Sequence, residues 1–288
     1  MKQEKVSSER GKNILNLTDE IKLALSSDMD YIGVASTERF KNAPNGWKPN
    51  DLLKSCTSIV SLGLRIGEGV KTANQRAYDG LRHGIYAYMM FGYTFLNERL
   101  NLAAFRISRL LEKKGHTAIP IPAAGPSDPY MMRGAFSHRH AAVAAGLGEF
   151  GWNGLLIAPG AGPRVRLVSI LTEAEISPDP MYYGNKLCDK DKCGVCISVC
   201  PTKAISENES LKIEIGGKSF EYGKVNKIRC RFGIDGLVKN ALGRQDVQIP
   251  DNPTLEDYLK SLAQENPWQK MERLASMCGR CMINCPVS

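Results

Sequence analysis

Eight cysteines in the C-terminal third of the chain have the residue type and spacing of iron–sulfur ligands. They are Cys188, Cys193, Cys196, Cys200, Cys230, Cys278, Cys281 and Cys285. The first run has the spacing C-x4-C-x2-C-x3-C-P, the last run has C-x2-C-x3-C-P, and one cysteine lies alone between them. A [4Fe-4S] cluster needs four thiolates at tetrahedral corners. C-x2-C turns supply neighbouring corners, and the cysteine before the proline commonly ligates the other cluster of a two-cluster ferredoxin. The spacing therefore predicts two [4Fe-4S] clusters.

Zinc and disulfide bonds are the competing interpretations of these cysteines. Zinc sites favour paired C-x2-C knuckles, often with His, and seldom repeat C-x2-C-x3-C-P. The chain opens with no signal peptide, so a cytoplasmic, reducing location is expected, and disulfides are rare there. The ninth cysteine, Cys56, precedes a strand-like run. It is expected to be a buried structural thiol, because free cysteine is commonly buried.

The composition is that of a globular protein, with 288 residues, 43% apolar and 24% charged. This length suits one large domain or two ordinary ones. Because no apolar run approaches the roughly 20 residues that span a bilayer, no membrane contact is expected. The formal net charge of +8 is typical of nucleic-acid binding. However, two oxidised clusters of about −2 each would offset much of it. A redox partner of ferredoxin or flavodoxin type is therefore favoured over nucleic acid.

The elements that position the cysteines alternate between helices and strands. Strands are expected over 31–36, 58–64, 117–122 and 164–172, with a small hairpin over 212–222. Helices are expected over 16–27, 86–114, 251–260 and 267–277. Thr18 is the expected N-cap of the first helix, and Gly115 is expected to end the long one. This alternation predicts an α/β or α+β layered architecture.

A glycine-rich stretch precedes the cysteine runs. Residues 137–157 predict a helix, a glycine-rich turn and a strand. Gly146, Gly148 and Gly151 match G-x-G-x-x-G. The dinucleotide fingerprint requires a strand before the glycines and a helix after them, and this order is not met. Glycine admits close backbone approach, so the stretch is either a surface for a flat ligand or a tight packing turn.

Four stretches together resemble the superfamily of corrinoid-dependent epoxyqueuosine reductases and reductive dehalogenases. They are AAVAAGLGEFGWNGLLIAPGAGPRVRLVSILTEAEI from residue 141, CGVCISVCPTKAI from residue 193, NKIRCRFGI from residue 226 and CGRCMINCP from residue 278. The order of these features is the most specific part of the match. The similarity covers about residues 137–205 and 226–286 and is weaker over 30–136.

The resemblance implies a nitroreductase-like α/β core that binds cobalamin over 1–182. It also implies a ferredoxin-like two-[4Fe-4S] module over 183–288, with an insertion at 206–277. One cluster would be held by Cys188, Cys193, Cys196 and Cys285, and the other by Cys200, Cys230, Cys278 and Cys281. The corrin contacts carried over are Ser137, Gly146, Leu147, Gly148, Gly151, Trp152, Asn153, Gly154, Leu155, Leu156 and Thr172.

The sequence also departs from the family pattern. Four residues separate Cys188 from Cys193, where the family commonly has two. The position of an aspartate proton donor in epoxyqueuosine reductases is Met132 here, and His138 replaces a glutamate. Trp152 follows the glycines where a lysine is common. Two further family features are expected to be absent. One is the set of C-terminal helical repeats that help epoxyqueuosine reductases hold tRNA, and the other is the twin-arginine export signal of respiratory dehalogenases. Both epoxyqueuosine reduction and exported respiratory dehalogenation are therefore disfavoured.

Few residues are candidates for donating a proton. A histidine near a corrin would suit this role, because its pKa lies near neutrality. His138 and His140 are two residues apart, so they do not share a helix face. The alternative is that one of them caps the helix near Ser137 or binds a backbone carbonyl. Tyr93 is the third candidate, because the dehalogenase-like mechanism uses a tyrosine donor, although tyrosines on a long helix more often pack in a core.

The expected function is that of a cytoplasmic iron–sulfur oxidoreductase. Electrons would pass through two [4Fe-4S] clusters to a bound cobalamin, which would reduce a small-molecule substrate. Two alternatives lack a cobalamin of their own. One is a ferredoxin-type electron carrier, and the other is a reductive activator of a separate corrinoid protein.

Overall fold

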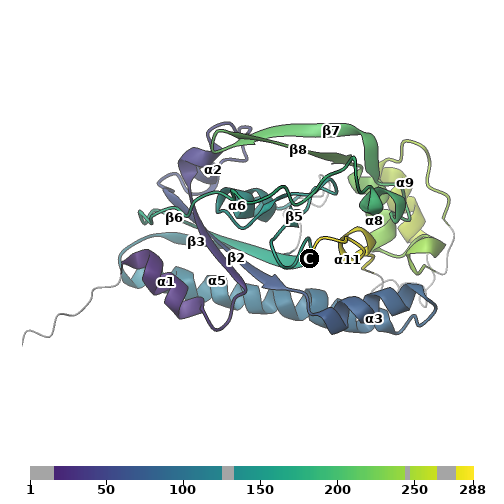
Figure 1. The fold of residues 1–288 in the computed structure, drawn as a ribbon, viewed down its shortest axis with the longest axis horizontal. Helices are drawn as coiled ribbons and strands as arrows, with labels where there is room; N and C mark the ends of the chain where they lie inside the picture. The colour runs from purple at the N-terminus through teal and green to yellow at the C-terminus, as the bar shows by residue number, and fades with distance from the viewer. Residues whose placement is uncertain (1–15, 125–132, 244–246, 265–276) are drawn as a thin grey trace, which may run out of the picture.

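The chain folds around a four-stranded sheet in the order β1-β2-β6-β3, in which all neighbouring strands are antiparallel (Figure 1). The strands are β1 Tyr31–Ser36, β2 Ser58–Arg65, β3 Ala118–Ile121 and β6 Val165–Thr172. The computed structural model describes residues 16–124, 133–243, 247–264 and 277–288. The mixed α/β architecture and the four expected strands are confirmed. The nitroreductase-like classification of the core stays a prediction.

Helices cover both faces of the sheet. Helices α1 (Leu17–Leu25) and α5 (Phe95–Lys113) pack on one face, and α6 (His138–Ala144) packs on the other (Figure 1). Successive strand side chains point to opposite faces. Accordingly, Val60 packs in the cluster with α5 and Ile59 in the cluster with α6. The central strands β2 and β6 are thus buried on both sides.

The N-cap of the first helix is Asn16, two residues before the expected Thr18. Asn16 is extended and its side chain accepts a hydrogen bond from the backbone N–H of Asp19 at 3.0 Å, so Asn16 is the N-cap. The prediction that Thr18 caps this helix is wrong. Thr18 lies inside the first turn, because asparagine at position 16 already satisfies a free N–H of that turn.

The long helical stretch changes its winding partway along. It comprises α4 (Gly84–Ala87), the π-helix η2 (Tyr88–Thr94) and α5. Gly115 follows with a φ of +87°, as expected for the glycine that ends a helix. π-Helical turns are rare and often occur at functional sites. This one carries both Tyr88 and Tyr93.

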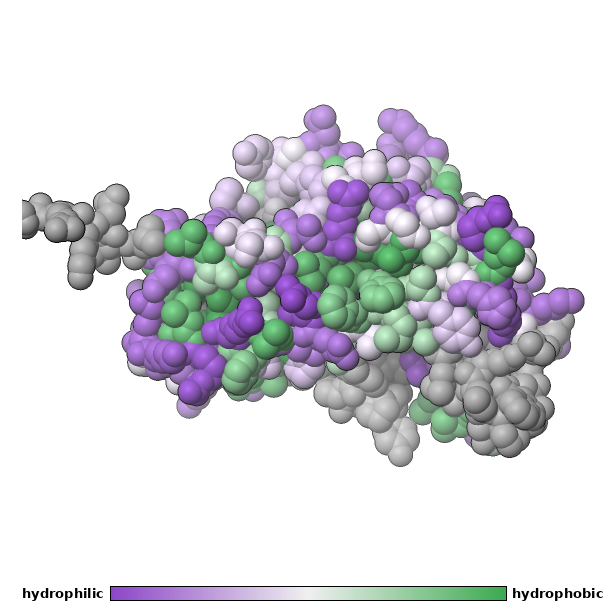
Figure 2. Space-filling model, turned by 90° about the horizontal axis from the view of Figure 1, so that it is seen from below, coloured by the Kyte–Doolittle hydropathy of each residue, from purple (hydrophilic) through white to green (hydrophobic). Residues whose placement is uncertain are grey.

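The outer side of η2 and α5 carries a row of exposed apolar residues, namely Phe91, Phe95, Leu102 and Phe105. Figure 2 views the molecule from this side and shows apolar side chains gathered in the middle of the face. The solvent side of the helix therefore carries apolar side chains next to charged ones such as Arg99 and Arg106.

The remaining elements are short, apart from one hairpin. They are η1 Thr37–Phe40, α2 Pro49–Leu52, α3 Glu68–Tyr78, β4 Glu149–Phe150, β5 Leu156–Ile157, α7 Val195–Ser198, β7 Ile205–Ile215, β8 Lys218–Val225, α8 Lys227–Ile234, η3 Lys239–Ala241, α9 Leu255–Ala263 and α11 Arg280–Ile283. The hairpin β7–β8 turns at Gly216-Gly217, as expected, but its strands are longer than predicted. The helix expected from 251 begins only after its cap Thr254. The one expected over 267–277 lies almost wholly outside the described residues.

The last residues of the chain pack back against the sheet domain. The Tyr78 hydroxyl donates to the carbonyl of Cys278 at 3.0 Å, and the Arg164 guanidinium donates to the carbonyl of Val287 at 2.7 Å. The domain boundary at 182/183 stays a prediction. Within the described parts of the chain, every helix is too short or too polar to span a membrane.

The two faces of α5 give a matched stability test. Leu100 is fully buried against the sheet and Leu102 is 44% exposed on the same helix. Leu100→Ala should lower the free energy of unfolding by about 2–5 kcal/mol, because it leaves a cavity. Leu102→Ala should change it by less than about 0.5 kcal/mol. Urea denaturation of both variants checks this. Equal losses would contradict the assigned orientation of α5.

Candidate metal centre

Each C-x2-C motif is built on a glycine and a one-turn helix. Gly194 has a φ of +67° and precedes α7, and Gly279 has a φ of +65° and precedes α11. Glycine adopts this left-handed conformation without the steric cost that other residues incur. The sharp turn lets both cysteines of a motif face the same site. Gly279 is further constrained, because an added Cβ would lie only 2.6 Å from the Tyr88 hydroxyl.

The thiols fall into two groups, and within each group neighbouring thiols raise one another's pKa. We call Cys188, Cys193, Cys196 and Cys285 the first set. The pKa of Cys196 is raised to about 11, first by burial and then by the thiols of the other three residues. Burial raises the pKa of Cys285 too, and the thiols of Cys188 and Cys193 add to it. Residues from both cysteine motifs thus share this site.

We call Cys200, Cys230, Cys278 and Cys281 the second set. Burial, followed by the thiols of Cys278 and Cys200, raises the pKa of Cys230 to about 12. The pKa of Cys281 is raised well above its usual value by burial, then by the other three thiols of its set and by Cys196. This last influence shows that the two sets are neighbours.

The donor chemistry of both sets suits a cofactor with four thiolate ligands. All nine cysteines are free thiols, and each set contains four of them and no histidine. The raised pKa values describe metal-free thiols, and a bound metal would deprotonate them. Among the described residues, no three His, Cys, Asp or Glu side chains meet at the spacing of a single metal ion. The identity of the metal stays a prediction, which iron analysis tests.

Backbone N–H groups point at two of the sulfurs. The N–H of Trp152 donates to the sulfur of Cys188 at 3.3 Å, and that of Ala204 donates to Cys200 at 3.2 Å. Glu149 accepts a hydrogen bond from the N–H of Cys188 at 3.0 Å. N–H donors to thiolates help set the reduction potential of an iron–sulfur cluster. The sequence assigned Trp152 to a corrin, and no side-chain signal foretells a backbone donor.

Three tyrosines lie on or near the second set, and the sequence singled out only Tyr93 among them. Tyr88 is buried, and burial raises its pKa, with further contributions from the Cys278 and Cys281 thiols. Tyr78 binds the carbonyl of Cys278, and its ring lies 4.5 Å from the Arg280 guanidinium. The Arg166 guanidinium lies 4.4 Å from the ring centroid of Tyr93, one of the three candidate proton donors. The catalytic role of Tyr93 stays a prediction.

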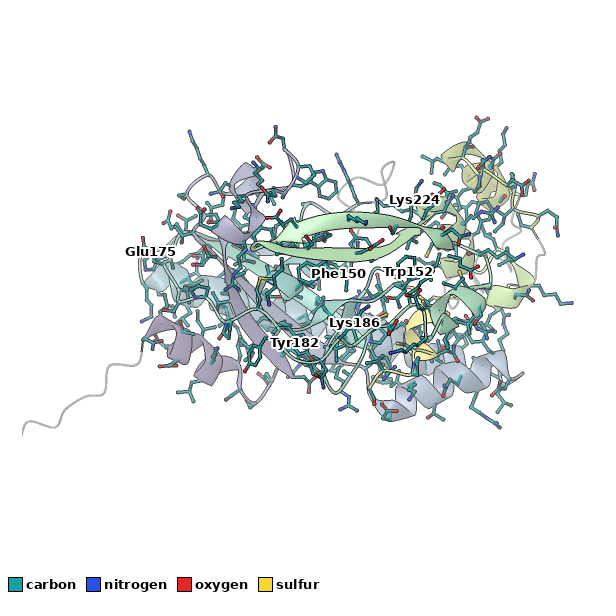
Figure 3. The ribbon with its side chains drawn as sticks, turned by 45° about the horizontal axis from the view of Figure 1, so that its top comes forward. Phe150, Trp152, Glu175, Tyr182, Lys186 and Lys224 are labelled. Carbon is teal, nitrogen blue, oxygen red and sulfur yellow. The ribbon has the colours of Figure 1, made fainter. Side chains whose placement is uncertain are left out.

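The glycine-rich loop packs against its own chain. A Cβ added at Gly146 would collide with the Pro180 carbonyl, and one added at Gly148 would collide with the Ile157 carbonyl. The hairpin covers the loop: the rings of Phe150 and Tyr222 lie 4.9 Å apart, and the N–H of Gly223 donates to the Trp152 carbonyl at 2.9 Å (Figure 3). The packing-turn interpretation therefore accounts for these glycines.

The other expected corrin contacts are also occupied by protein groups. Gly151, Gly154, Leu147, Leu156 and Asn153 are buried, and Leu155 packs against the apolar cluster of α3 and α11. Thr172 is fully buried and its hydroxyl donates to the Thr117 carbonyl at 2.9 Å. These loop residues therefore make packing contacts within the chain, and their role as corrin contacts stays a prediction. Met132 lies outside the described residues.

Both candidate histidines have hydrogen-bond partners inside the protein. The Nε2 of His138 lies 2.9 Å from the Pro122 carbonyl, so this nitrogen carries the proton, and Nδ1 accepts from the Ser169 hydroxyl at 2.9 Å. Burial lowers the pKa of His138. The Nδ1 of His140 lies 2.5 Å from the Ser137 hydroxyl, and burial, then Arg139, lowers the pKa of His140 to about 4. The donor role of both residues stays a prediction.

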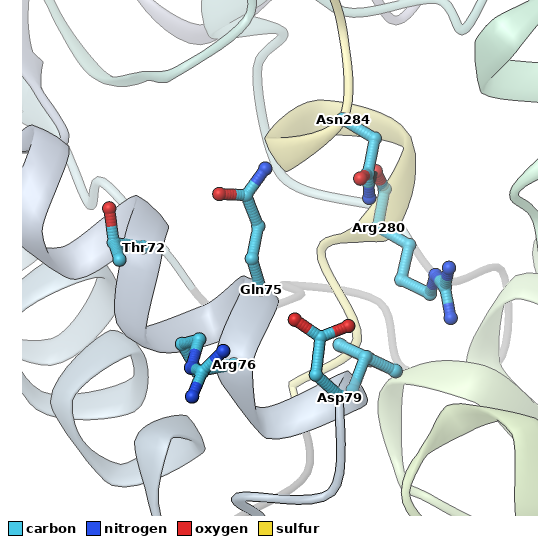
Figure 4. A pocket seen from close by; sticks show the side chains of 7 residues that line it. Thr72, Gln75, Arg76, Asp79, Arg280 and Asn284 are labelled. Atoms are coloured by element: carbon cyan, nitrogen blue, oxygen red, sulfur yellow. Dashed lines mark hydrogen bonds between the residues drawn. The ribbon is translucent and has the colours of Figure 1, made fainter.

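A pocket of about 250 Å³ opens between α3 and α11 (Figure 4). It is lined by Thr72, Gln75, Arg76, Tyr78, Asp79, Arg280 and Asn284. Pockets for drug-sized ligands have about 300–1,000 Å³, so this pocket takes a small ligand at most. Tyr78 and Arg280 connect its wall to the second set.

Known proteins give a context for this geometry, although no family model matches the chain. The tetrachloroethene reductive dehalogenase of Desulfitobacterium hafniense is 37% identical over 113 residues, which are 38% of this chain and 18% of that enzyme. The epoxyqueuosine reductase of Staphylococcus aureus is 28% identical over 171 residues, which are 57% of this chain and 40% of that enzyme. The match is at the level of the superfamily. The resemblance inferred from the sequence is confirmed.

A solved structure supports the fold. A reductive dehalogenase, described with a mechanism for B12-dependent dehalogenation, has a TM-score of 0.54 and 18% identity. The likeness covers 96% of this chain and 39% of that one. The chain therefore spans less than half the length of each of these three proteins.

The burial of His140 predicts a specific pH dependence of stability. Its pKa is about 4 in the folded protein and about 6.5 when unfolded. The unfolded chain therefore binds the proton first, and stability is lost as the pH falls below about 6.5. Between pH 7.5 and 5.5 this loss is about 1.4 kcal/mol, and His140→Gln should remove it.

Urea denaturation at both pH values checks this expectation. The control is His83→Gln, because His83 is exposed and should leave the pH dependence unchanged. A His140→Gln protein with the wild-type pH dependence would refute the burial of a neutral imidazole.

Proposed function

We propose that the chain is an iron–sulfur oxidoreductase that passes electrons through two [4Fe-4S] clusters to a bound cobalamin, which reduces a small substrate. The observation that carries the first part is the arrangement of eight thiols in two neighbouring sets of four. The relatives are reductases, which supports the class of reaction. When bound, the clusters supply one-electron transfer.

Different residues of this chain would bind the metal, hydrogen-bond the sulfurs and face the redox partner. The eight thiols hold the metal, and the N–H groups of Trp152 and Ala204 bind two of the sulfurs. Cys193 is the exposed member of the eight, so the first set lies nearest to solvent and to a redox partner of ferredoxin or flavodoxin type. The influence of Cys196 on Cys281 supports direct passage of electrons between the sets.

Cobalamin rests on the similarity to a B12-dependent dehalogenase, which shares the fold. The hairpin covers the loop at 146–156, so cobalamin bound there would have to displace the hairpin contacts. The same observation favours the alternative in which the chain is an electron carrier, or reduces a separate corrinoid protein. A nucleic-acid partner stays disfavoured, as predicted from the sequence. A cytoplasmic location stays the expectation. Salt-dependent RNA binding would revive a role on tRNA.

Iron analysis tests the cluster proposal. The anaerobically reconstituted protein should hold about eight irons, as two cubanes require. Cys285→Ser should lose about four irons from the first set, and Cys230→Ser about four from the second. Cys56→Ser is the control and should keep all eight, because Cys56 is buried away from both sets, between Leu53 and Ser58. Zinc in place of iron would refute the proposal.

Titration with cob(II)alamin separates the two forms of the proposal. Stoichiometric binding with a base-off cobalt signal in EPR is expected if the chain is itself a corrinoid enzyme. An unchanged cobalamin spectrum in a protein with eight irons would exclude that form. The electron carrier or activator would then be the function, and capture of a corrinoid protein would be the next experiment.

A further inference from the structure

Arg164 is a buried cation that holds the end of the chain. Its side chain is 2% exposed. Its guanidinium donates to the carbonyl of Cys285 at 2.9 Å and to that of Val287 at 2.7 Å. Close packing supports this junction, because an added Cβ at Gly162 would collide with the Val287 carbonyl. The loop before β6 therefore fixes the backbone on either side of Pro286.

The charge of Arg164 has no buried anion to balance it among the described side chains. Its Nε is buried and has no hydrogen-bond partner there. The pKa of the Glu68 carboxyl is lowered by Lys71 and, to a smaller extent, by Arg164. However, Glu68 is exposed and pairs with Lys71 at 3.0 Å, so it is not a buried partner for Arg164. Carbonyl oxygens accept hydrogen bonds without supplying a charge. A buried cation is costly unless an anion lies near it.

The first set supplies that anion once metal is bound. Arg164 lies beside this set, because its guanidinium binds the backbone carbonyl of the ligand Cys285 itself. A 2+ cubane core held by four thiolates carries about −2.

We infer that Arg164 is a positioning residue for the first set: it aligns Cys285 through the tail carbonyls and raises the reduction potential of the cluster. This inference rests on the proposed function and goes beyond it by assigning unequal surroundings to the two sets. A fixed positive charge favours the more negative, reduced form of a cluster. Removing the charge should therefore lower the potential of the first set alone.

Arg164→Met and Arg164→Lys separate charge from shape. Methionine keeps an unbranched side chain without the charge, and lysine keeps the charge without the two-pronged donor. The control is Arg65→Met, which removes an equal charge from an arginine whose side chain is 44% exposed. Cys285→Ser identifies the EPR signal of the first set. The measurements are iron content and EPR-monitored redox titration of the anaerobically reconstituted proteins.

Arg164→Met should shift the first-set equilibrium at least tenfold toward the oxidised form, which is about 59 mV for one electron, or lose about four irons from that set alone. Arg164→Lys should keep the wild-type potential. Unchanged potentials in Arg164→Met, equal loss of both signals, or an equal shift in Arg65→Met would overturn the inference. Wild-type protein without cluster signals would instead refute the proposed function, and this inference with it.

Discussion

The arrangement of this protein depends on an exchange of cysteines between two motifs. The first motif gives three thiols to the first set and Cys200 to the second, and the last motif gives two to the second set and Cys285 to the first. Neither set is complete until both motifs meet. The contacts at Tyr78, Asn153 and Arg164 serve that meeting, because each binds a backbone carbonyl within or beside the last motif.

Buried polar groups in the described part of the chain are unpartnered mainly near this meeting point. Such atoms occur on Ser61, Asn74, Arg164 and Arg280. Arg164 binds the carbonyl of Cys285, Arg280 adjoins Cys281, and Asn74 lies one helical turn before Tyr78, which binds the carbonyl of Cys278. Unsatisfied polar groups are costly in a core without a ligand. Their concentration here is consistent with a polar or charged cofactor between the motifs.

Local rules predicted much of the fold, and they failed where the answer depended on a distant segment. The strands and the long helix followed from apolar periodicity, and the hairpin turn followed from Gly216-Gly217. The two groups of neighbouring thiols match the ligand sets that the resemblance implies, and their role as cluster ligands stays a prediction. The π-helical winding at Tyr88 and the backbone donor at Trp152 have no such signal. The sequence did not decide between a ligand surface and a packing turn for the glycine loop. The choice depends on which atoms of distant segments lie next to each glycine.

The hairpin packs over the glycine loop and holds it in place. It is fastened by the Trp152 indole, which donates to the Ser206 carbonyl at 2.8 Å, and by the N–H of Gly216, which donates to the Arg39 carbonyl at 3.0 Å. Each such bond contributes about 1 kcal/mol, and the packing of Phe150 adds to them. A bulky ligand on the loop would have to offset these losses. Because Trp152 also donates to Cys188, displacing the hairpin would disturb the first set. Trp152 thus connects the hairpin to the first set of thiols.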